Sequence, residues 1–172
     1  RNLASAPLNI KSNNFNENTL EINDDNILHS ESSENIKINI GAESLINSYF
    51  KNDFNIGLSK YILAGNSYNS LKNNSIFVHV SASEEIQRIR LIVNNSKNIN
   101  ADIQIHIFLE NDAKLEVIDE SYHEGNSSIR IFSLIDKGAK LNMYRFNKYS
   151  PNKVNSFFHF IRVNENSVFK DY

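Results

Sequence analysis

The sequence has no cysteine and no tryptophan, and among its 172 residues only two are proline and five are glycine. The absence of cysteine excludes disulfides, a thiolate nucleophile, and cysteine-ligated zinc or iron–sulfur centres within this chain. With so few glycines, a glycine-rich phosphate-binding loop is not expected. Pro7 and Pro151 lie outside every segment that we predict to be a strand, as the hydrogen-bonded ladder of a sheet requires.

Neither sign of charge predominates, since 18 basic side chains are matched by 20 acidic ones. This balance gives no electrostatic reason to expect nucleic acid or an anionic membrane as a partner. No apolar run approaches the length that crosses a bilayer, and the first ten residues lack the apolar core of a signal peptide. We therefore expect a cytoplasmic protein, or a plastid protein if a targeting segment has been removed ahead of Arg1.

A short pattern recurs three times late in the sequence: an apolar residue, a polar turn, a small residue and a new apolar strand. The three copies are Leu109–Leu115, Ile135–Leu141 and Val163–Phe169. Ala113, Ala139 and Ser167 hold the small position, at spacings of 26 and 28 residues. A period of this size predicts a structural unit that stacks on copies of itself. Because the segments between the turns alternate apolar and polar residues, we predict a mainly β fold, a right-handed parallel β-helix.

The chain divides by its periodicity into two parts. Residues 75–172 are predicted to form the rungs of the β-helix, apparently truncated at their end. Residues 1–74 are predicted to form an N-terminal segment with a short helical lead-in and two short strands, Thr19–Ile22 and Asn35–Ile40. Apolar residues at helical spacing over 42–64 predict two short helices with a break near Asn52. We expect this pair to cover the open end of the strand stack.

The alternation within the rungs also predicts which side chains are buried. Glu120–Asn126 is predicted to be a longer polar loop between rungs. The residues expected in the interior are Ile105, Ile107, Leu115, Val117, Ile129, Ile131, Leu141, Met143 and Ile161.

No group of residues predicts a catalytic or metal site. The histidines show no helical metal-ligand spacing, and we expect each to be exposed or hydrogen-bonded on a strand; they are His29, His79, His106, His123 and His159. Asp119, Glu120 and Glu124 flank His123, an arrangement that could bind a cation or perform acid–base chemistry, although a solvated loop is the simpler interpretation. Nothing near His123 resembles a nucleophile elbow, despite three serines, Ser121, Ser127 and Ser128. The aromatic run Phe157–Phe160 could stack a ligand, but core packing is the preferred interpretation.

Several segments, taken in order, resemble the SufB/SufD family, the scaffold proteins of the SUF iron–sulfur assembly machinery. Ser75–Val80 followed by Glu84–Gln87 is similar to a strand that begins this family's β-helix, although Ser81 and Glu85 stand where the family usually has proline. The matching later segments are Ile107–Glu120, Ile135–Tyr144 and Phe157–His159, and Phe54–Leu71 resembles the helical lead-in. The resemblance covers roughly residues 45–170.

The resemblance implies a function and partners. SufB-type members usually carry a Cys-Thr-Ala-Pro sequence where this chain has Ser121–Gly125, so the chain is more similar to the SufD branch. The implied role is a non-catalytic scaffold that pairs with a SufB-like subunit and the SufC-like ATPase, with the iron–sulfur cluster handled by the whole complex. Because family members continue for more rungs and a helical domain, we expect this chain to be a fragment or a reduced protein. No catalytic or cofactor-binding residue carries over.

Two alternatives remain. A polysaccharide lyase or hydrolase on a β-helix needs charged side chains stacked at equivalent positions on adjacent rungs. No acidic ladder is evident, and the arginines are scattered, at Arg88, Arg90, Arg130, Arg145 and Arg162. A secreted solenoid adhesin would need an export signal, which the visible start lacks.

Overall fold

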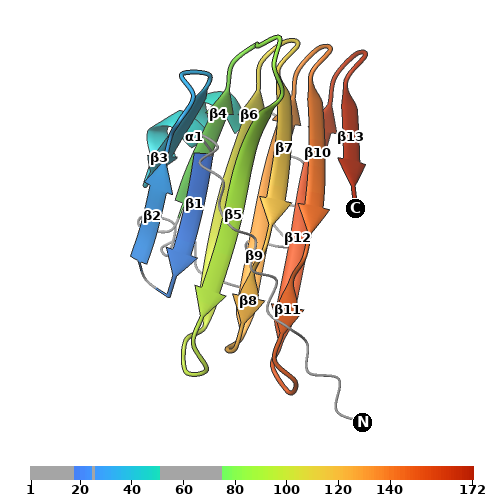
Figure 1. Ribbon diagram of the computed structural model, residues 1–172. Coiled ribbons are helices and arrows are strands. Elements are labelled where there is room, and N and C mark those ends of the chain that lie inside the picture. The colour runs from blue at the N-terminus through green and yellow to red at the C-terminus, as the bar shows by residue number, and fades with distance from the viewer. Residues whose placement is uncertain (1–17, 25, 51–74) are drawn as a thin grey trace.

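The computed structural model describes residues 18–24, 26–50 and 75–172. These residues form a mainly β structure, a β-solenoid of about three turns, in which two largely parallel sheets face each other (Figure 1). The fold class predicted from the repeated turns is therefore confirmed.

The first sheet, sheet A, has the strand order β11-β8-β5-β7-β10-β13, and β1 pairs with β5 from Ile89 to Asn94. Strands β7 and β8 belong to one rung, as do β10 and β11, and a short break separates the two strands of each rung. The strands of sheet A are β1 (Asn18–Asn23), β2 (Asn26–Ser30), β5 (Gln87–Asn95), β7 (Lys114–Asp119), β8 (Tyr122–His123), β10 (Lys140–Arg145), β11 (Lys148–Tyr149) and β13 (Val168–Asp171).

The second sheet, sheet B, has the order β12-β9-β6-β4-β3. Its strands are β3 (Ile36–Ile40), β4 (Ser75–Val80), β6 (Ala101–Leu109), β9 (Ser127–Ile135) and β12 (Asn155–Val163). The chain rises through a strand of sheet B, turns, descends through sheet A and returns, so that each circuit advances by one rung in a right-handed coil (Figure 1).

The three recurring turns stack in register, as predicted. Lys114 lies beside Lys140, and Lys140 lies beside Val168, so Ala113, Ala139 and Ser167 occupy one line along the solenoid. The Lys140 amide donates to the Ala113 carbonyl at 2.8 Å, which ties one turn to the next. Both alanines have no exposed surface, which explains the need for a small side chain there.

The residue before each small position has a left-handed backbone. The φ angles are 62° at Asp112, 70° at Gly138 and 57° at Asn166. Glycine, asparagine and aspartate are the residues that adopt this conformation at least cost. At Gly138 an added Cβ would also lie 2.2 Å from Oδ1 of Asp112 in the neighbouring turn. The polar turn signal in the sequence is therefore a requirement of backbone geometry and close stacking.

The N-terminal end of the solenoid is closed by strands. β2 pairs antiparallel with β1, and β3 pairs antiparallel with β4, so both sheets end in a reversed strand on this side. We expected helices to close this end, and that expectation is wrong for the first helix. Helix α1 (Glu43–Phe50) packs on the outer face of sheet B, where the Phe50 ring meets His106 at 5.1 Å. The second predicted helix falls within 51–74, outside the described residues.

The predicted interior is confirmed, with one position less buried than the rest. Eight of the nine side chains named above have at most 4% of their surface exposed, while Ile161 is half-buried on the last rung of sheet B. The two early strands are also confirmed, as β1 and β3. Both are part of the same core as the rungs, since Leu20 and Ile38 belong to the main cluster of buried residues.

Candidate functional site in the solenoid interior

Polar side chains replace apolar ones on the inner face of sheet A toward the C-terminal end. Leu91 of β5 lies beside Asp119 of β7, which lies beside Arg145 of β10. Inward and outward side chains alternate along β7 and β8, so Ser121 and His123 continue the inward line that Asp119 begins. These residues do not form the polar loop that we predicted over Glu120–Asn126, because β8 continues the rung inside that segment.

Asp119 is the centre of a buried hydrogen-bond network. Its side chain is 1% exposed, and it accepts hydrogen bonds from Ser121 Oγ at 2.5 Å and from Asn147 Nδ2 at 2.9 Å. Ser121 Oγ in turn accepts from the Val93 amide at 3.0 Å, which links three rungs. Burial raises the pKa of Asp119, while Ser121, Asn147 and the charge of Arg145 act in the opposite direction. The network satisfies a carboxylate that the interior would otherwise penalise.

Arg145 joins the two sheets at the last rungs. Its guanidinium forms an ion pair with Asp171 of β13 and lies over the Phe157 ring of β12, with Cζ 3.9 Å from the ring centroid. On the same inner face of β12, His159 Nε2 hydrogen-bonds to Ser133 Oγ at 2.8 Å. Burial, and then the charge of Arg145, lower the pKa of His159 to about 3, so this imidazole is neutral at physiological pH.

His123 is fully buried on β8, at the far end of the rung that contains Asp119. Asn95 Nδ2 donates to the carbonyls of Ile99 and Asn126, so the Asn95 oxygen faces His123 and accepts from its Nδ1 at 3.0 Å. This arrangement assigns the proton to Nδ1 and leaves Nε2 as an acceptor, which makes no hydrogen bond to any described residue. Tyr149 stacks on the ring at 5.1 Å, and burial lowers the pKa of His123.

The other three histidines lie away from this interior network. His29 is exposed on β2, and His79 pairs with Glu110 at 2.8 Å on the outer face of sheet B. His106 is buried on that outer face between Phe50 and Phe132, whose ring stacks on it at 4.8 Å. Burial lowers the pKa of His106 to about 4. The expectation of exposed or hydrogen-bonded histidines is confirmed for all five, since the His106 ring also hydrogen-bonds to the Ile76 backbone.

The carboxylate cluster suggested by the sequence does not assemble. Asp119 and His123 point inward, whereas Glu120 points outward and pairs with Arg90 at 3.2 Å. Because neighbouring residues on a strand face opposite sides, Glu120 lies on the other face of the sheet from Asp119. Among the described residues, no group of three or more histidine, cysteine, aspartate or glutamate side chains is placed to hold a metal ion.

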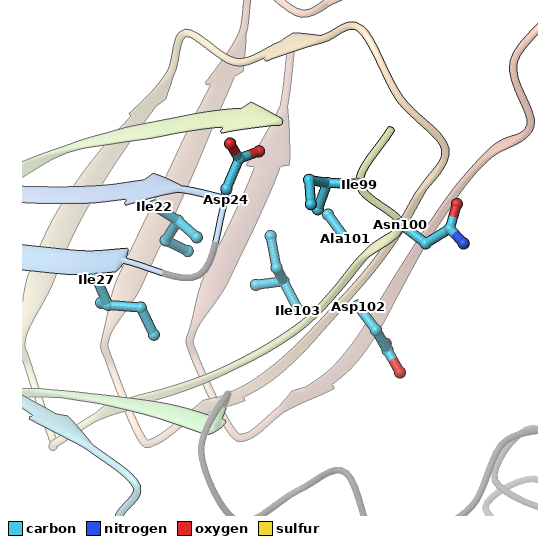
Figure 2. A pocket seen from close by; sticks show the side chains of 8 residues that line it. All are labelled: Ile22, Asp24, Ile27, Ile99, Asn100, Ala101, Asp102 and Ile103. Carbon is cyan, nitrogen blue, oxygen red and sulfur yellow. The ribbon is translucent and has the colours of Figure 1, made fainter. Parts of the chain in front are cut away.

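A small cleft opens at the end of the solenoid where the β1–β2 turn meets the β5–β6 loop (Figure 2). Its volume is about 30 Å³, which accommodates water rather than an organic substrate. Isoleucine side chains occupy its middle, Asp102 points away, and Asp24 at the rim accepts from the Ser96 amide at 2.7 Å. Nothing in this geometry forms a catalytic cleft.

Sequence analysis missed Asn147 and Arg145 as neighbours of Asp119, and Asp171 as the ion-pair partner of Arg145. The signal was present for Arg145, because the turn spacing of 26 residues leads from Asp119 to Arg145, whereas Asp171 lies beside Met143 and reaches Arg145 from there. No helix in the described part of the chain is long and apolar enough to span a membrane. No protein-family model matches the sequence, and no curated protein matches it either.

Proposed function

We propose that this chain is a non-catalytic scaffold subunit of the SUF iron–sulfur assembly machinery, of the SufD type, which pairs with SufB-like and SufC-like subunits. One observation carries the proposal: the segments that resemble the SufB/SufD family fall at equivalent places on successive rungs. Ile107–Glu120 spans the end of β6, a turn and β7, and Ile135–Tyr144 spans the end of β9, the next turn and β10. Ser75–Val80 is β4, one rung earlier.

The nature of the polar groups supports a structural role. Asp119, Ser121 and His123 each have at most 2% of their surface exposed and are engaged within the network, so a substrate in solution does not reach them. Without cysteine, this chain supplies no thiolate to an iron–sulfur cluster, which would be cargo of the whole complex. We place this work in the cytoplasm, or in a plastid if a targeting segment is removed.

No observation favours a carbohydrate-active enzyme. Such an enzyme needs two carboxyl groups that flank a sugar in an accessible site. On the outer face of sheet A, Glu116 and Glu120 each pair with an arginine, Arg88 at 2.7 Å and Arg90 at 3.2 Å. Each carboxylate is held by its cationic neighbour, and the cleft beside the β1–β2 turn, of about 30 Å³, is too small for a sugar ring.

The test is co-purification of this chain with the SufB-like and SufC-like proteins encoded in the same genome. We expect a stable complex with the SufB-like subunit, and cluster formation only when the complex is supplied with iron and sulfide. Ile131→Asp, which places a charge at a fully buried position, should abolish binding by disrupting the fold. Leu28→Asp, at an exposed position of β2, should leave binding unchanged. Failure of the unmodified chain to bind either subunit would overturn the proposal.

A further inference from the structure

Strand β3 lies at the N-terminal edge of sheet B (Figure 1). Among the described strands it pairs only with β4, so its other side meets no described strand. Three isoleucines alternate along it. Ile36 and Ile38 are at most 4% exposed, and Ile40 is 37% exposed. An edge strand with apolar side chains readily pairs with a strand of another molecule unless something occupies its backbone groups.

The pairing with β4 shows which backbone groups of β3 face the outer edge. The Ser81 amide, just after β4, donates to the Asn35 carbonyl, just before β3, at 2.9 Å. Successive residues of a strand direct their amide and carbonyl groups alternately to its two sides. Odd-numbered residues of β3 therefore bond to β4. The amides of Ile36, Ile38 and Ile40 point to the outer edge, where an added strand would need them as donors.

Two of these three amides already have acceptors in the link between β2 and β3. The Ile38 amide donates to Oε1 of Glu31 at 2.6 Å, and the Ile36 amide donates to the Ser33 carbonyl at 3.3 Å. Oε2 of Glu31 lies 3.8 Å from Nζ of Lys37, which holds the carboxylate beside the strand. The Glu31 carboxylate therefore takes the place that a carbonyl of an added strand would have.

Asn18 fixes the same link to sheet A. Its Oδ1 accepts from the amides of Ser32 and Ser33 at 2.9 and 3.3 Å, and its Nδ2 donates to the Arg88 carbonyl at 2.9 Å. Asn18 is 3% exposed, so these hydrogen bonds are shielded from water. The residue that follows Glu31 is thus anchored, and the carboxylate is held at the edge of β3 by a fixed backbone.

We propose that Glu31 is a blocking contact, which prevents a second copy of this chain from pairing with β3. Its carboxylate competes for the Ile38 amide within the chain, where the acceptor is always at hand. A strand of a second copy would have to displace it and would gain no additional hydrogen bond at that amide. This inference does not depend on the proposed function, because it concerns only the edge of sheet B.

The register of the pairing that Glu31 prevents follows from the amides that its removal frees. A two-fold axis at Asn39 lets Ile38 and Ile40 of each copy exchange backbone hydrogen bonds, while Ile36 keeps its bond to Ser33. The two Asn39 side chains then face each other as neutral groups that can hydrogen-bond. A centre at Ile38 would require the Ile36 amide, which is already engaged. The contact about Asn39 is isologous, as a two-fold dimer requires.

Hydrogen exchange of the Ile38 amide tests the contact itself. At low protein concentration, Glu31→Ala should speed this exchange by about tenfold or more, because the amide loses its acceptor. Glu31→Gln should keep most of the protection, since a side-chain amide oxygen also accepts. The Lys37 amide, which bonds to β4, should exchange at an unchanged rate in both variants and reports an intact strand. Equal exchange of the Ile38 amide in the parent chain and in Glu31→Ala would overturn the proposal.

Sedimentation over a range of concentrations tests the consequence for association. Glu31→Ala should self-associate with a dissociation constant about tenfold or more below that of the parent chain, because its β3 edge accepts a second strand. Glu31→Gln should sediment like the parent. Lys37→Ala is the matched control, since it removes the ion pair with Glu31 and leaves the hydrogen bond to Ile38 in place. Association of Glu31→Ala no stronger than that of the parent, or equal to that of Lys37→Ala, would overturn the proposal.

Cross-linking in the Glu31→Ala background locates the contact. The chain has no cysteine, so one introduced thiol is unique. Asn39→Cys places two thiols across the axis on residues whose Cα atoms are about 4.5 Å apart, within disulfide range. Lys37→Cys places them four residues apart along the strands, about 13 Å. Mild oxidation should give a covalent dimer from Asn39→Cys only. Equal cross-linking of both variants, or none, would contradict pairing through β3.

Discussion

The two ends of the solenoid interior are built from different chemistry on the same backbone. Near the N-terminal end, Leu20, Leu91 and Ile105 meet between the sheets and each is at most 3% exposed. Near the C-terminal end, the equivalent space holds Arg145 and His159. Each rung contacts only its neighbours, so side-chain chemistry can change from rung to rung while the ladder continues.

The ends also differ in their exposed edges. β2 and β3 close the N-terminal end as reversed strands, whereas β12 and β13 end the sheets as parallel strands. Apolar burial supports the first end without directional bonds, while the second depends on a network whose members need one another. The predictions below test that difference, from the largest expected effect to the smallest.

The largest loss is expected in the apolar interior. Ile131→Ala removes a side chain with no exposed surface and should lower the unfolding free energy by about 2–5 kcal/mol. Ile161→Ala, on the half-buried last rung, should cost clearly less because its surroundings can collapse or hydrate. Urea denaturation measures both. Equal losses would mean that the last rung is as tightly packed as the middle of the solenoid. That result would contradict the contrast drawn between the two ends.

Asp119→Leu copies the residue that β5 has at the neighbouring position, Leu91. The single change should destabilise by about 3 kcal/mol, because Ser121 and Asn147 lose their acceptor and Arg145 loses a neighbouring anion. Combining it with Arg145→Met should recover part of the loss, since the charge of Arg145 then no longer lies beside an apolar side chain at position 119. Chemical denaturation measures the unfolding free energy of the single and the double variant. A double variant no more stable than the single one would show that residues 119 and 145 are not energetically coupled.

Acid should weaken the fold through its buried neutral histidines. The pKa of His106 is about 4 in the folded protein, against 6.5 for the free side chain, so the unfolded chain binds a proton first as the pH falls. The unfolding free energy should therefore decrease from about pH 6.5 toward pH 4, by up to about 1.4 kcal/mol per pH unit for this residue. His159 acts in the same direction, with a folded pKa of about 3.

His106→Phe distinguishes the contribution of His106, on the outer face of sheet B, from that of His159 in the C-terminal interior. Phenylalanine can stack between Phe50 and Phe132 as the histidine does, and it does not titrate. The variant should show a shallower loss of stability between pH 6.5 and 4, measured by denaturation at several pH values. His29→Phe, on the exposed strand β2, should not change the slope. If His106→Phe keeps the full slope, the acid sensitivity comes from the C-terminal interior instead.

The smallest effect is expected on the outer face of sheet A. Arg88→Gln breaks the ion pair with Glu116, and the Arg88 side chain is 52% exposed. Exposed pairs of this kind contribute less than about 1 kcal/mol and are screened by salt. Thermal melts at low and high salt should therefore show only a small difference, largest at low salt. A loss comparable to that of Asp119→Leu would contradict the view that the energetic contrast lies in the interior.

Some of the fold could be predicted because its signals are local. Ala113 and Ala139 follow left-handed turn residues, and their fixed spacing indicates stacking without any knowledge of distant contacts. The strand β2 was missed because Asn26–Ser30 has no clear alternation and is held only by its pairing with β1. The second half of the rung at Tyr122–His123 was missed because a polar run there resembles a loop, although its side chains alternate in direction.

The candidate site shows where local reasoning reaches its limit. The sequence grouped Asp119, Glu120 and His123 by adjacency, but strand geometry sends Glu120 to the opposite face. The true partners of Asp119 are Ser121, two residues away, and Asn147, one rung away. A polar residue inside a parallel stack finds its partners at the period of the rung. Testing residues at that spacing would have identified the network.

By itself the sequence determined the strand periodicity, the position of the stacked turns and the identity of the apolar interior, because each follows from backbone sterics and side-chain alternation within one rung. Only the tertiary structure decided that reversed strands close the N-terminal end, that α1 lies on the outer face of sheet B, and that Asp119 hydrogen-bonds to Asn147 one rung away while Arg145 pairs with Asp171. Those outcomes depend on contacts between residues far apart in the chain, whose free energies no local pattern encodes.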